Sequence, residues 1–349
     1  MAKKVRILSI DGGGIRGILP GMLLVGLEKK LQEVSGDTNA RIADYFDLVS
    51  GTSTGGILGC VMLAPGSEGS TRPKYTAMEA VNVYLERGDK IFDVPTWKKI
   101  TSAGGLRDEK YPATEIEKAL DEYLGGGLKL SELLKPTVIS SYDLQGGTPF
   151  FFKQHRAKDD LGAEFMVKDV ARATSAAPTY FECANVKSFS NKSYPLIDGG
   201  VYVNNPALCA YAEARTMTFD ELRPGHFENG SDKPISNDLF LLSLGTASSS
   251  KSYAYNDAKD WGMVQWIQPL IEIMMSGVAA NVDYQLREIF NATNSGKFYE
   301  RINPFLGQAE SAMDNASKEN LQKLKEAGED NVKRYDRKLT EIAEILVSS

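Results

Sequence analysis

The first feature that could carry chemistry is a serine between glycines, Gly51-Thr52-Ser53-Thr54-Gly55, which has the form G-x-S-x-G. An apolar stretch precedes it and another follows, so we expect a strand before the serine and a helix after it. Such a sharp turn exposes the serine hydroxyl, and the glycines leave out side chains that would collide there. The pattern indicates a nucleophile at Ser53, although a turn that only caps a helix has a similar composition.

A glycine-rich turn, DGGGIRG at 11–17, ends the first apolar stretch. It also fits G-x-G-x-x-G, but a dinucleotide site needs a strand ending in an acidic residue about 20 positions further on. Here that region reads as helix and loop. Bare N–H groups at the start of a helix bind anions, so Gly12, Gly13 and Gly14 are expected to hold the oxyanion of an acyl-transfer intermediate. Arg16 would add a positive charge nearby.

The candidate base is Asp198, which follows an apolar stretch and precedes two glycines. Asp-Gly is also a common turn pair. The chain has two histidines, His155 and His226, and the order Ser53, Asp198, His226 would suit a histidine-based triad. That α/β-hydrolase fold builds several strands before its nucleophile, whereas only two apolar segments precede Ser53. We therefore expect a base other than histidine, with both histidines at the surface.

The elements that would position these residues alternate along the chain. Strands are expected at 5–10 and 45–50, each followed by a helix, at 17–34 and 54–64. This alternation predicts an α/β fold with a mostly parallel central sheet. We expect a single domain over 1–349, with a core at about 5–250 and a helical C-terminal elaboration at about 258–349, ending in one charged helix at 318–346.

Composition restricts the class of protein. The chain has 349 residues, is 42% hydrophobic and carries a net charge of −6, which does not favour a nucleic acid polymer as partner. We expect no secretory signal and no membrane-spanning helix. The cysteines Cys60, Cys183 and Cys209 are odd in number and unrelated in spacing, so reduced, packed thiols are expected. No cluster has the spacing of metal ligands, and neither a metal nor a cofactor is expected.

In this order, DGGGIRG, GTSTGG and DGG resemble the signatures of the patatin-like lipid acyl hydrolases. Further segments are similar to members of that family: ATSAAPTYF at 173–181, VNNPA at 203–207, AKDWGMVQW at 258–266 and MDNAS at 313–317. The resemblance implies a three-layer α/β/α fold and a Ser-Asp dyad, with Ser53 as nucleophile and Asp198 as general base. It also assigns Gly12, Gly13 and Gly14 to the oxyanion loop and Arg16 to its basic residue.

The resemblance further implies hydrolysis of fatty-acyl esters of the phospholipase A or galactolipase type. A phospholipid or glycolipid would be the substrate, and the protein would be cytoplasmic and peripheral to membranes. Two alternatives stay open: a soluble carboxylesterase with the same dyad, and a catalytically idle storage or binding protein. The sequence leaves open whether a nucleotide activates the protein and whether it forms homo-oligomers.

One apolar stripe at helical spacing has two interpretations. Its members are Met263, Ile267, Leu270, Ile271, Met274 and Val278, with Trp261 and Trp266 beside them. A core helix packed on the sheet is the simpler interpretation. The alternative is that part of this segment borders an entrance for acyl chains and touches a membrane surface, to which tryptophan is suited by its apolar body and polar N–H.

Overall fold

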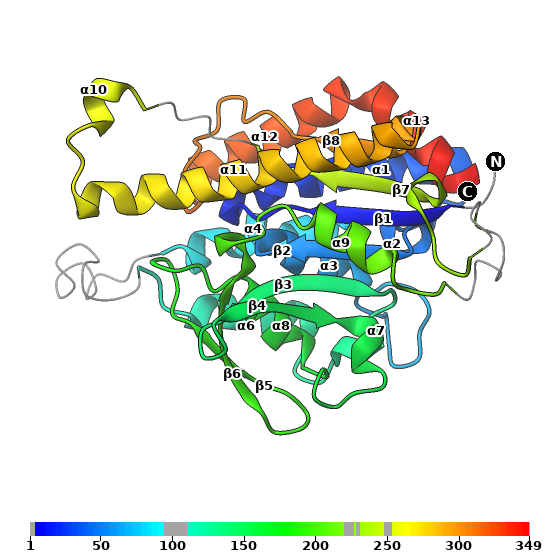
Figure 1. The fold of residues 1–349 in the computed structure, drawn as a ribbon, viewed down its shortest axis with the longest axis horizontal. Helices are drawn as coiled ribbons and strands as arrows, with labels where there is room; N and C mark the ends of the chain where they lie inside the picture. The colour runs from blue at the N-terminus through cyan, green and yellow to red at the C-terminus, as the bar shows by residue number, and fades with distance from the viewer. Residues whose placement is uncertain (1–3, 94–109, 220–226, 228–230, 248–252, 349) are drawn as a thin grey trace.

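The computed structural model describes residues 4–93, 110–219, 227, 231–247 and 253–348 (Figure 1). The strands of these residues form one sheet of order β5-β6-β3-β2-β1-β7-β8, with β4 paired to β3. Their bounds are β1 (Val5–Ile10), β2 (Leu48–Thr52), β3 (Thr137–Asp143), β4 (Thr148–Lys153), β5 (Ala184–Lys187), β6 (Ser193–Asp198), β7 (Leu239–Leu244) and β8 (Tyr299–Ile302).

The middle of the sheet is parallel, as the alternation of strands and helices predicts. Strand β1 pairs with β2 and β7, and the ladder continues in parallel from β2 to β3 and from β7 to β8. The antiparallel strands β4, β5 and β6 are confined to the region of β3. Parallel strands end at the same edge, so the turns after β1 and β2 lie next to each other.

Helices cover both faces of this sheet, which confirms the three-layer α/β/α prediction. Alternate residues of β1 belong to different cores: Leu8 and Ile10 to one, Val5 and Ile7 to the other. The first face is covered by α1 (Ile18–Ser35), α3 (Thr54–Leu63), α4 (Ala77–Ile91), α6 (Thr114–Leu124), α8 (Val167–Thr174), α12 (Lys318–Arg334) and α13 (Asp336–Ser348). The second is covered by α9 (Ala207–Ala214) and the C-terminal half of α11 (Met263–Ala292).

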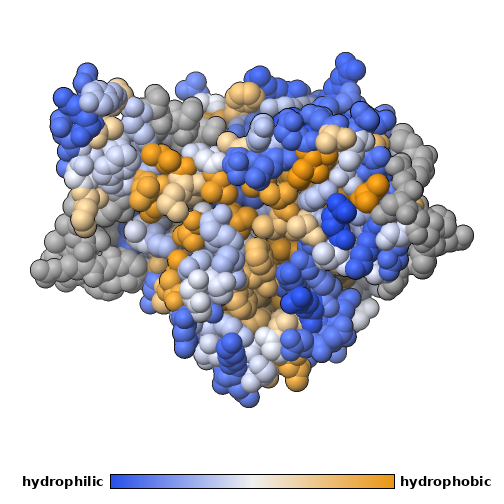
Figure 2. All heavy atoms as spheres, viewed as in Figure 1, coloured by the Kyte–Doolittle hydropathy of each residue, from blue (hydrophilic) through white to orange (hydrophobic). Residues whose placement is uncertain are grey.

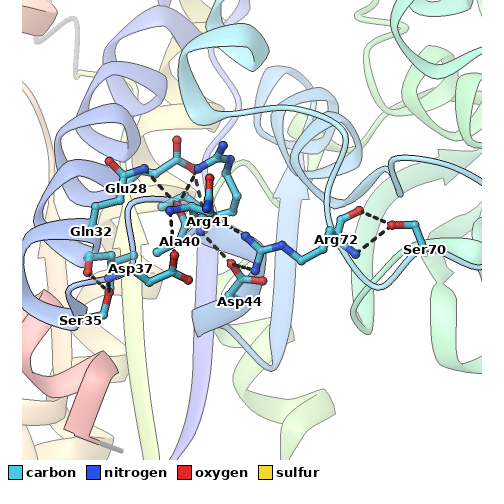
Figure 3. A network of polar contacts seen from close by, with 12 residues as sticks. Glu28, Gln32, Ser35, Asp37, Ala40, Arg41, Asp44, Ser70 and Arg72 are labelled. Atoms are coloured by element: carbon cyan, nitrogen blue, oxygen red, sulfur yellow. Dashed lines mark hydrogen bonds and ion pairs between the residues drawn. The ribbon is translucent and has the colours of Figure 1, made fainter.

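A buried carboxylate ties three helices of the first face together (Figure 3). Glu28 of α1 accepts the N–H of Ile42, where α2 (Ile42–Tyr45) begins, and that of Ala77, where α4 begins. These N–H groups have no partner inside their own helices. Burial raises the pKa of Glu28, while the two backbone hydrogen bonds oppose that shift. The network fixes α4, which forms one wall of the pocket described below.

Several elements differ from the sequence-based predictions. The strand expected at 45–50 begins at Leu48, because the short helix α2 occupies 42–45. The charged helix expected at 318–346 is broken at Tyr335 into α12 and α13, and both pack on α1. The C-terminal segment, expected to be helical, also supplies β8 to the central sheet. Two further short helices of the part that the structure describes are α7 (Gln154–Ala157) and α10 (Tyr255–Ala258).

Two expectations from composition concern thiols and membrane spans. Cys60 is buried and Cys209 half-buried, but Cys183 is exposed, so the prediction of packed thiols is wrong at that position. Within the described residues, no helix combines the length and the apolar character needed to cross a bilayer.

Candidate active site

Ser53 lies in a strained turn between β2 and α3. Its φ of 55° and ψ of −124° belong to a region that residues with a side chain seldom occupy. The turn is tight enough that a Cβ on Gly55 would lie 2.2 Å from the carbonyl oxygen of Ile10. Strand β1 and the start of α3 therefore approach each other closely beneath the serine, which is the geometry expected for G-x-S-x-G.

Thr174, at the end of α8, holds this turn in place. The backbone N–H of Ser53 donates to the Thr174 hydroxyl at 2.8 Å, and that hydroxyl donates to the Ser140 carbonyl in β3 at 2.7 Å. Thr174 lies in the segment ATSAAPTYF, but no role was predicted for it from the sequence. The structure makes it a link between the serine turn and the neighbouring strand.

Asp198 is brought to Ser53 by the register of β3. Strand β4 occupies one edge of β3, so β2 and β6 must share the other. Ser140 is paired with Thr52, and the next residue, Ser141, is paired with Asp198. The end of β2 and the end of β6 thus meet at consecutive residues of one strand. This placement puts Asp198 beside Ser53, as the sequence-based dyad requires.

The Asp198 carboxyl is buried in surroundings that offer little solvation. Only 4% of the residue is exposed, and Ser53 is 7% exposed. Burial raises the pKa of Asp198 to about 7, while hydrogen bonds from the Ser53 side chain and the Gly200 N–H lower it. The Gly200 bond measures 2.7 Å. A carboxylate with a pKa near neutrality can accept a proton from a hydroxyl far better than an ordinary aspartate can.

The glycine loop after β1 faces Ser53, but its three glycines are not equivalent. Gly12 donates its N–H to the Asn204 carbonyl at 3.0 Å. The sequence-based prediction that the Gly12 N–H holds the oxyanion is therefore not supported, because this N–H already has a partner. Within the described residues, no hydrogen bond uses the N–H of Gly13 or Gly14. Gly14 has a φ of 58° and, like Ser53, borders the apolar pocket described below.

Arg16 lies on the other side of this loop, in the wall of a polar cavity of about 240 Å³. Its Nε donates to the Gly13 carbonyl at 3.4 Å, and its Nη1 is buried without a partner. Burial lowers the pKa of the guanidinium to about 10, so it stays charged at neutral pH. Arg16 does not line the pocket that contains Ser53 and Asp198. Its direct contact is with the loop carbonyl, which makes it a positioning residue for Gly13.

The C-terminal segment also supports the loop. Arg301 of β8 forms a bidentate pair with Asp11, with Nη1–Oδ1 and Nη2–Oδ2 distances of 2.8 and 2.5 Å. The Met313 carbonyl accepts the Ile15 N–H at 2.8 Å. Met313 belongs to the segment MDNAS, and Asn204, the partner of Gly12, belongs to VNNPA. The sequence comparison assigned these two segments no role. In the structure, their backbone carbonyls accept hydrogen bonds from the glycine loop and hold it in place.

An apolar pocket opens onto Ser53 and Asp198, with a volume of about 120 Å³. Its walls come from helices on both sides of the nucleophile, and their apolar side chains include Ile57, Val83, Tyr84, Ile91, Ile116, Leu120, Ile271, Met274 and Met275. Among the residues that line it, Arg, Lys and Glu are absent, and Asp198 is the one with a charged side chain. A cavity of this kind accepts a hydrocarbon chain.

Neither histidine is placed by the described structure as a base for Ser53. His155 lies on α7, where its Nε2 is 2.9 Å from Oε1 of Glu213, and it does not line the pocket. It is half-buried, not at the surface as expected. His226 lies outside the described residues. Among the residues that are described, no group of three His, Cys, Asp or Glu side chains could hold a metal ion.

Comparisons with known proteins identify a family that the chain resembles along most of its length. A family model described as "Patatin-like phospholipase" matches residues 8–211, which include Ser53 and Asp198. Patatin-like protein 2 of Oryza sativa subsp. indica is 35% identical, over 96% of this chain and 86% of its own length. Patatin-like protein 1 of Arabidopsis thaliana is 35% identical, over 93% of this chain and 80% of its own length. A Solanum tuberosum relative named "Probable inactive patatin-3-Kuras 1" is 32% identical, over 96% of this chain and 88% of its own length.

The family model spans more than half of the chain, and the relatives match it along nearly its whole length. This supports lipid acyl hydrolase activity in general. The chain belongs to the patatin-like phospholipase family.

Proposed function

We propose that this protein hydrolyses fatty-acyl ester bonds of phospholipids or glycolipids through an acyl-enzyme on Ser53. Asp198 is the general base, and the N–H groups of Gly13 and Gly14 bind the oxyanion. The observation that carries the proposal is that Ser53 and Asp198 share one buried, apolar pocket. The same lack of solvation that admits an acyl chain raises the pKa of the carboxyl to about 7.

The first half of the reaction forms the acyl-enzyme. Asp198 takes the hydroxyl proton as the Ser53 oxygen attacks the ester carbonyl, whose oxygen becomes negatively charged. The N–H groups of Gly13 and Gly14 stabilise that charge. When the intermediate collapses, the carbon–oxygen bond to the alcohol breaks, and the proton on Asp198 passes to the departing alkoxide. The fatty-acyl group is left as an ester of Ser53.

The second half releases the fatty acid. Asp198, ionised again, takes a proton from a water molecule as that water attacks the acyl-enzyme. The second oxyanion is stabilised by the same loop. Its collapse breaks the bond to Ser53, and Asp198 returns its proton to the serine oxygen. No net proton change occurs on the protein, and the ester and water have become an alcohol and a fatty acid.

A chain-length comparison separates this proposal from a soluble carboxylesterase. Ala119 of α6 lies in the pocket wall and is buried, so Ala119→Phe would fill acyl-chain space without touching Ser53. We expect kcat/KM for a long-chain phospholipid in mixed micelles to fall at least roughly tenfold. Hydrolysis of a four-carbon acyl ester should change less than about twofold. Equal losses on both substrates, or a wild-type preference for the short ester, would favour the carboxylesterase.

A labelling experiment separates the proposal from an idle storage protein, which matters because one relative carries the word inactive in its name. A fluorophosphonate probe should modify wild-type protein once, at Ser53, as seen by intact mass and peptide mapping. Ser53→Ala should remain unlabelled. Absence of labelling in a folded wild-type protein would support the idle alternative.

A further inference from the structure

The N-terminal half of α11 exposes a concentrated apolar surface. Large apolar side chains of this helix with exposed fractions from 39% to 87% are Met263, Trp266, Leu270, Ile273 and Met274. The spacings from Met263 through Trp266 and Leu270 to Ile273 are three, four and three residues, which places these side chains along one side of the helix, and Met274 is next to Ile273. Figure 2 shows apolar residues gathered over this part of α11. Proteins in water seldom expose a contiguous apolar cluster of this kind unless it is a binding surface.

The simpler interpretation of the stripe from Met263 to Val278, a core helix packed on the sheet, is wrong for its exposed members Met263, Leu270 and Met274. The part of α11 that packs on the sheet starts near Val278, at the end of the stripe. Val282, Leu286 and Phe290 are buried against the sheet. The exposed cluster ends at Met274, about two helical turns before Val282. The two halves of α11 therefore have different environments, and the N-terminal half is the part that needs an explanation.

This surface is continuous with the acyl pocket. Met274 is 42% exposed and also lines the pocket that contains Ser53. Ile271 and Met275, on the adjoining side of the same helix, line the pocket as well. The exposed surface and the wall of the acyl pocket therefore share Met274.

The charge pattern indicates which kind of lipid surface fits. No Lys or Arg lies between Lys259 and Arg287, and the only acid between Met263 and Val282 is Glu272. Glu272 accepts a hydrogen bond from Tyr253 at 3.1 Å and lines the polar cavity, so its charge faces the protein body. The stretch of α11 from Met263 to Val282 therefore has no basic side chain of its own to attract anionic headgroups, and its binding to lipid depends on apolar burial.

Aromatic rings stabilise the exposed end of the helix. Trp261 stacks edge-on against Trp266 and against Tyr253, with ring centroids 5.1 and 4.9 Å apart. Rings with an apolar body and a polar group are suited to the boundary between headgroups and acyl chains.

We infer that the N-terminal half of α11 docks the protein on zwitterionic or uncharged lipid surfaces and delivers acyl chains to the pocket. This rests on the proposed function for its substrate, but docking can be measured without turnover. The full chain carrying Ser53→Ala should bind phosphatidylcholine vesicles, measured by flotation. Adding 20% phosphatidylglycerol, or raising the salt concentration, should change the partition coefficient less than about twofold.

The test replaces Met263, Trp266 and Leu270 together with serine in the Ser53→Ala protein. None of the three lines the pocket. We expect the partition coefficient to fall roughly tenfold or more, since three apolar side chains lose their burial in lipid. The matched control is Leu144→Ser with Leu161→Ser, two exposed leucines elsewhere on the surface. It should bind like the parent, and both variants should keep the parent's thermal midpoint.

Four outcomes would overturn the inference: no vesicle binding by the parent, unchanged binding by the triple variant, an equal loss in the leucine control, or binding only to anionic vesicles. If the triple variant instead converts a dimer to a monomer and still binds vesicles, the surface joins two copies of the chain. With Ser53 intact, the triple variant should hydrolyse a water-soluble short ester like wild type. Vesicle binding by a protein that hydrolyses no ester would refute the proposed function and leave docking standing.

Discussion

Ser53 and Asp198 line the same apolar pocket although they lie at the ends of different strands, and β3 is the element that brings them together. Thr52 and Asp198 are paired with the consecutive residues Ser140 and Ser141. The Thr52 and Ser140 hydroxyls are 2.7 Å apart, and the Ser141 hydroxyl donates to the Ile197 carbonyl at 2.6 Å. Buried hydrogen bonds on both sides therefore fix the separation between nucleophile and base.

The rate of ester hydrolysis should depend on the ionisation of Asp198. The base must be ionised to take the Ser53 proton, and burial raises its pKa to about 7. Activity should therefore rise with pH and reach half its maximum near pH 7, measured as kcat/KM on a water-soluble ester from pH 4 to 9. An aspartate of ordinary pKa would give a midpoint near 4. A midpoint there would contradict the buried-base assignment.

The raised pKa of Asp198 also predicts how the free energy of unfolding depends on pH. A carboxyl whose pKa is raised in the folded state binds more protons there than in the unfolded chain, so its contribution to stability is present at low pH and lost as pH rises through about 7. Asp198→Asn removes the buried charge and keeps an acceptor for the Gly200 N–H. We expect it to be more stable than wild type at pH 8 by about 1 to 4 kcal/mol.

Urea unfolding at several pH values checks this. The difference between Asp198→Asn and wild type should shrink steadily from pH 8 to pH 5. A variant that is less stable than wild type at pH 8, or a difference independent of pH, would show that the ionised carboxylate is well solvated or paired in the native state.

Gly55 should tolerate no side chain. Its added Cβ would lie 2.2 Å from the Ile10 carbonyl oxygen, a backbone atom that cannot move without separating β1 from α3. Gly55→Ala is expected to destabilise the protein by roughly 3 kcal/mol or more and to remove labelling of Ser53.

The matched control is Gly59→Ala in the same helix, where the nearest contact is Val49 Cγ1 at 3.3 Å. Its unfolding free energy should change by less than about 1 kcal/mol. Equal stability of the two variants would contradict the close approach.

Arg16 should act on turnover through the Gly13 carbonyl that its Nε contacts. Loss of this contact loosens the oxyanion loop, so Arg16→Ala is expected to lower kcat and kcat/KM together, roughly tenfold to a hundredfold. Arg16→Lys, which keeps the positive charge and N–H donors, should recover part of the loss. An increase in KM at constant kcat would point to substrate binding in the polar cavity instead. Steady-state kinetics on a soluble ester distinguish the two.

Much of this fold follows from local sequence pattern. The apolar runs that form β1, β2 and β7 are short and bounded by turn residues, and the strand–helix alternation leaves few topologies other than a parallel sheet. By contrast, β5 and β8 have only four residues each. Segments this short do not carry enough of a pattern to be distinguished from loop. Tyr335 breaks the last helix although no glycine or proline stands there.

The candidate site divides in the same way. The serine turn and the glycine loop each have a distinctive pattern beside an apolar stretch, whereas Asp198 stands in a common Asp-Gly turn and was indicated only by the three motifs together. Thr174 and Arg301 were not predictable, because a buried threonine or arginine has no local signature, and their partners Ser53 and Asp11 are distant in sequence. The use of the Gly12 N–H by Asn204 is likewise a tertiary contact that no local pattern reveals.

The catalytic assignment is tested most directly by the turnover of Ser53→Ala, Asp198→Asn and the double variant, with His155→Ala and His226→Ala as comparisons. Each single change at the dyad should lower kcat about a thousandfold or more, and combining them should add little, because the two residues act as one unit. Both histidine variants should stay within a few fold of wild type. An active Asp198→Asn protein, or loss of activity in a folded His226→Ala protein, would contradict the Ser-Asp dyad and favour a histidine base.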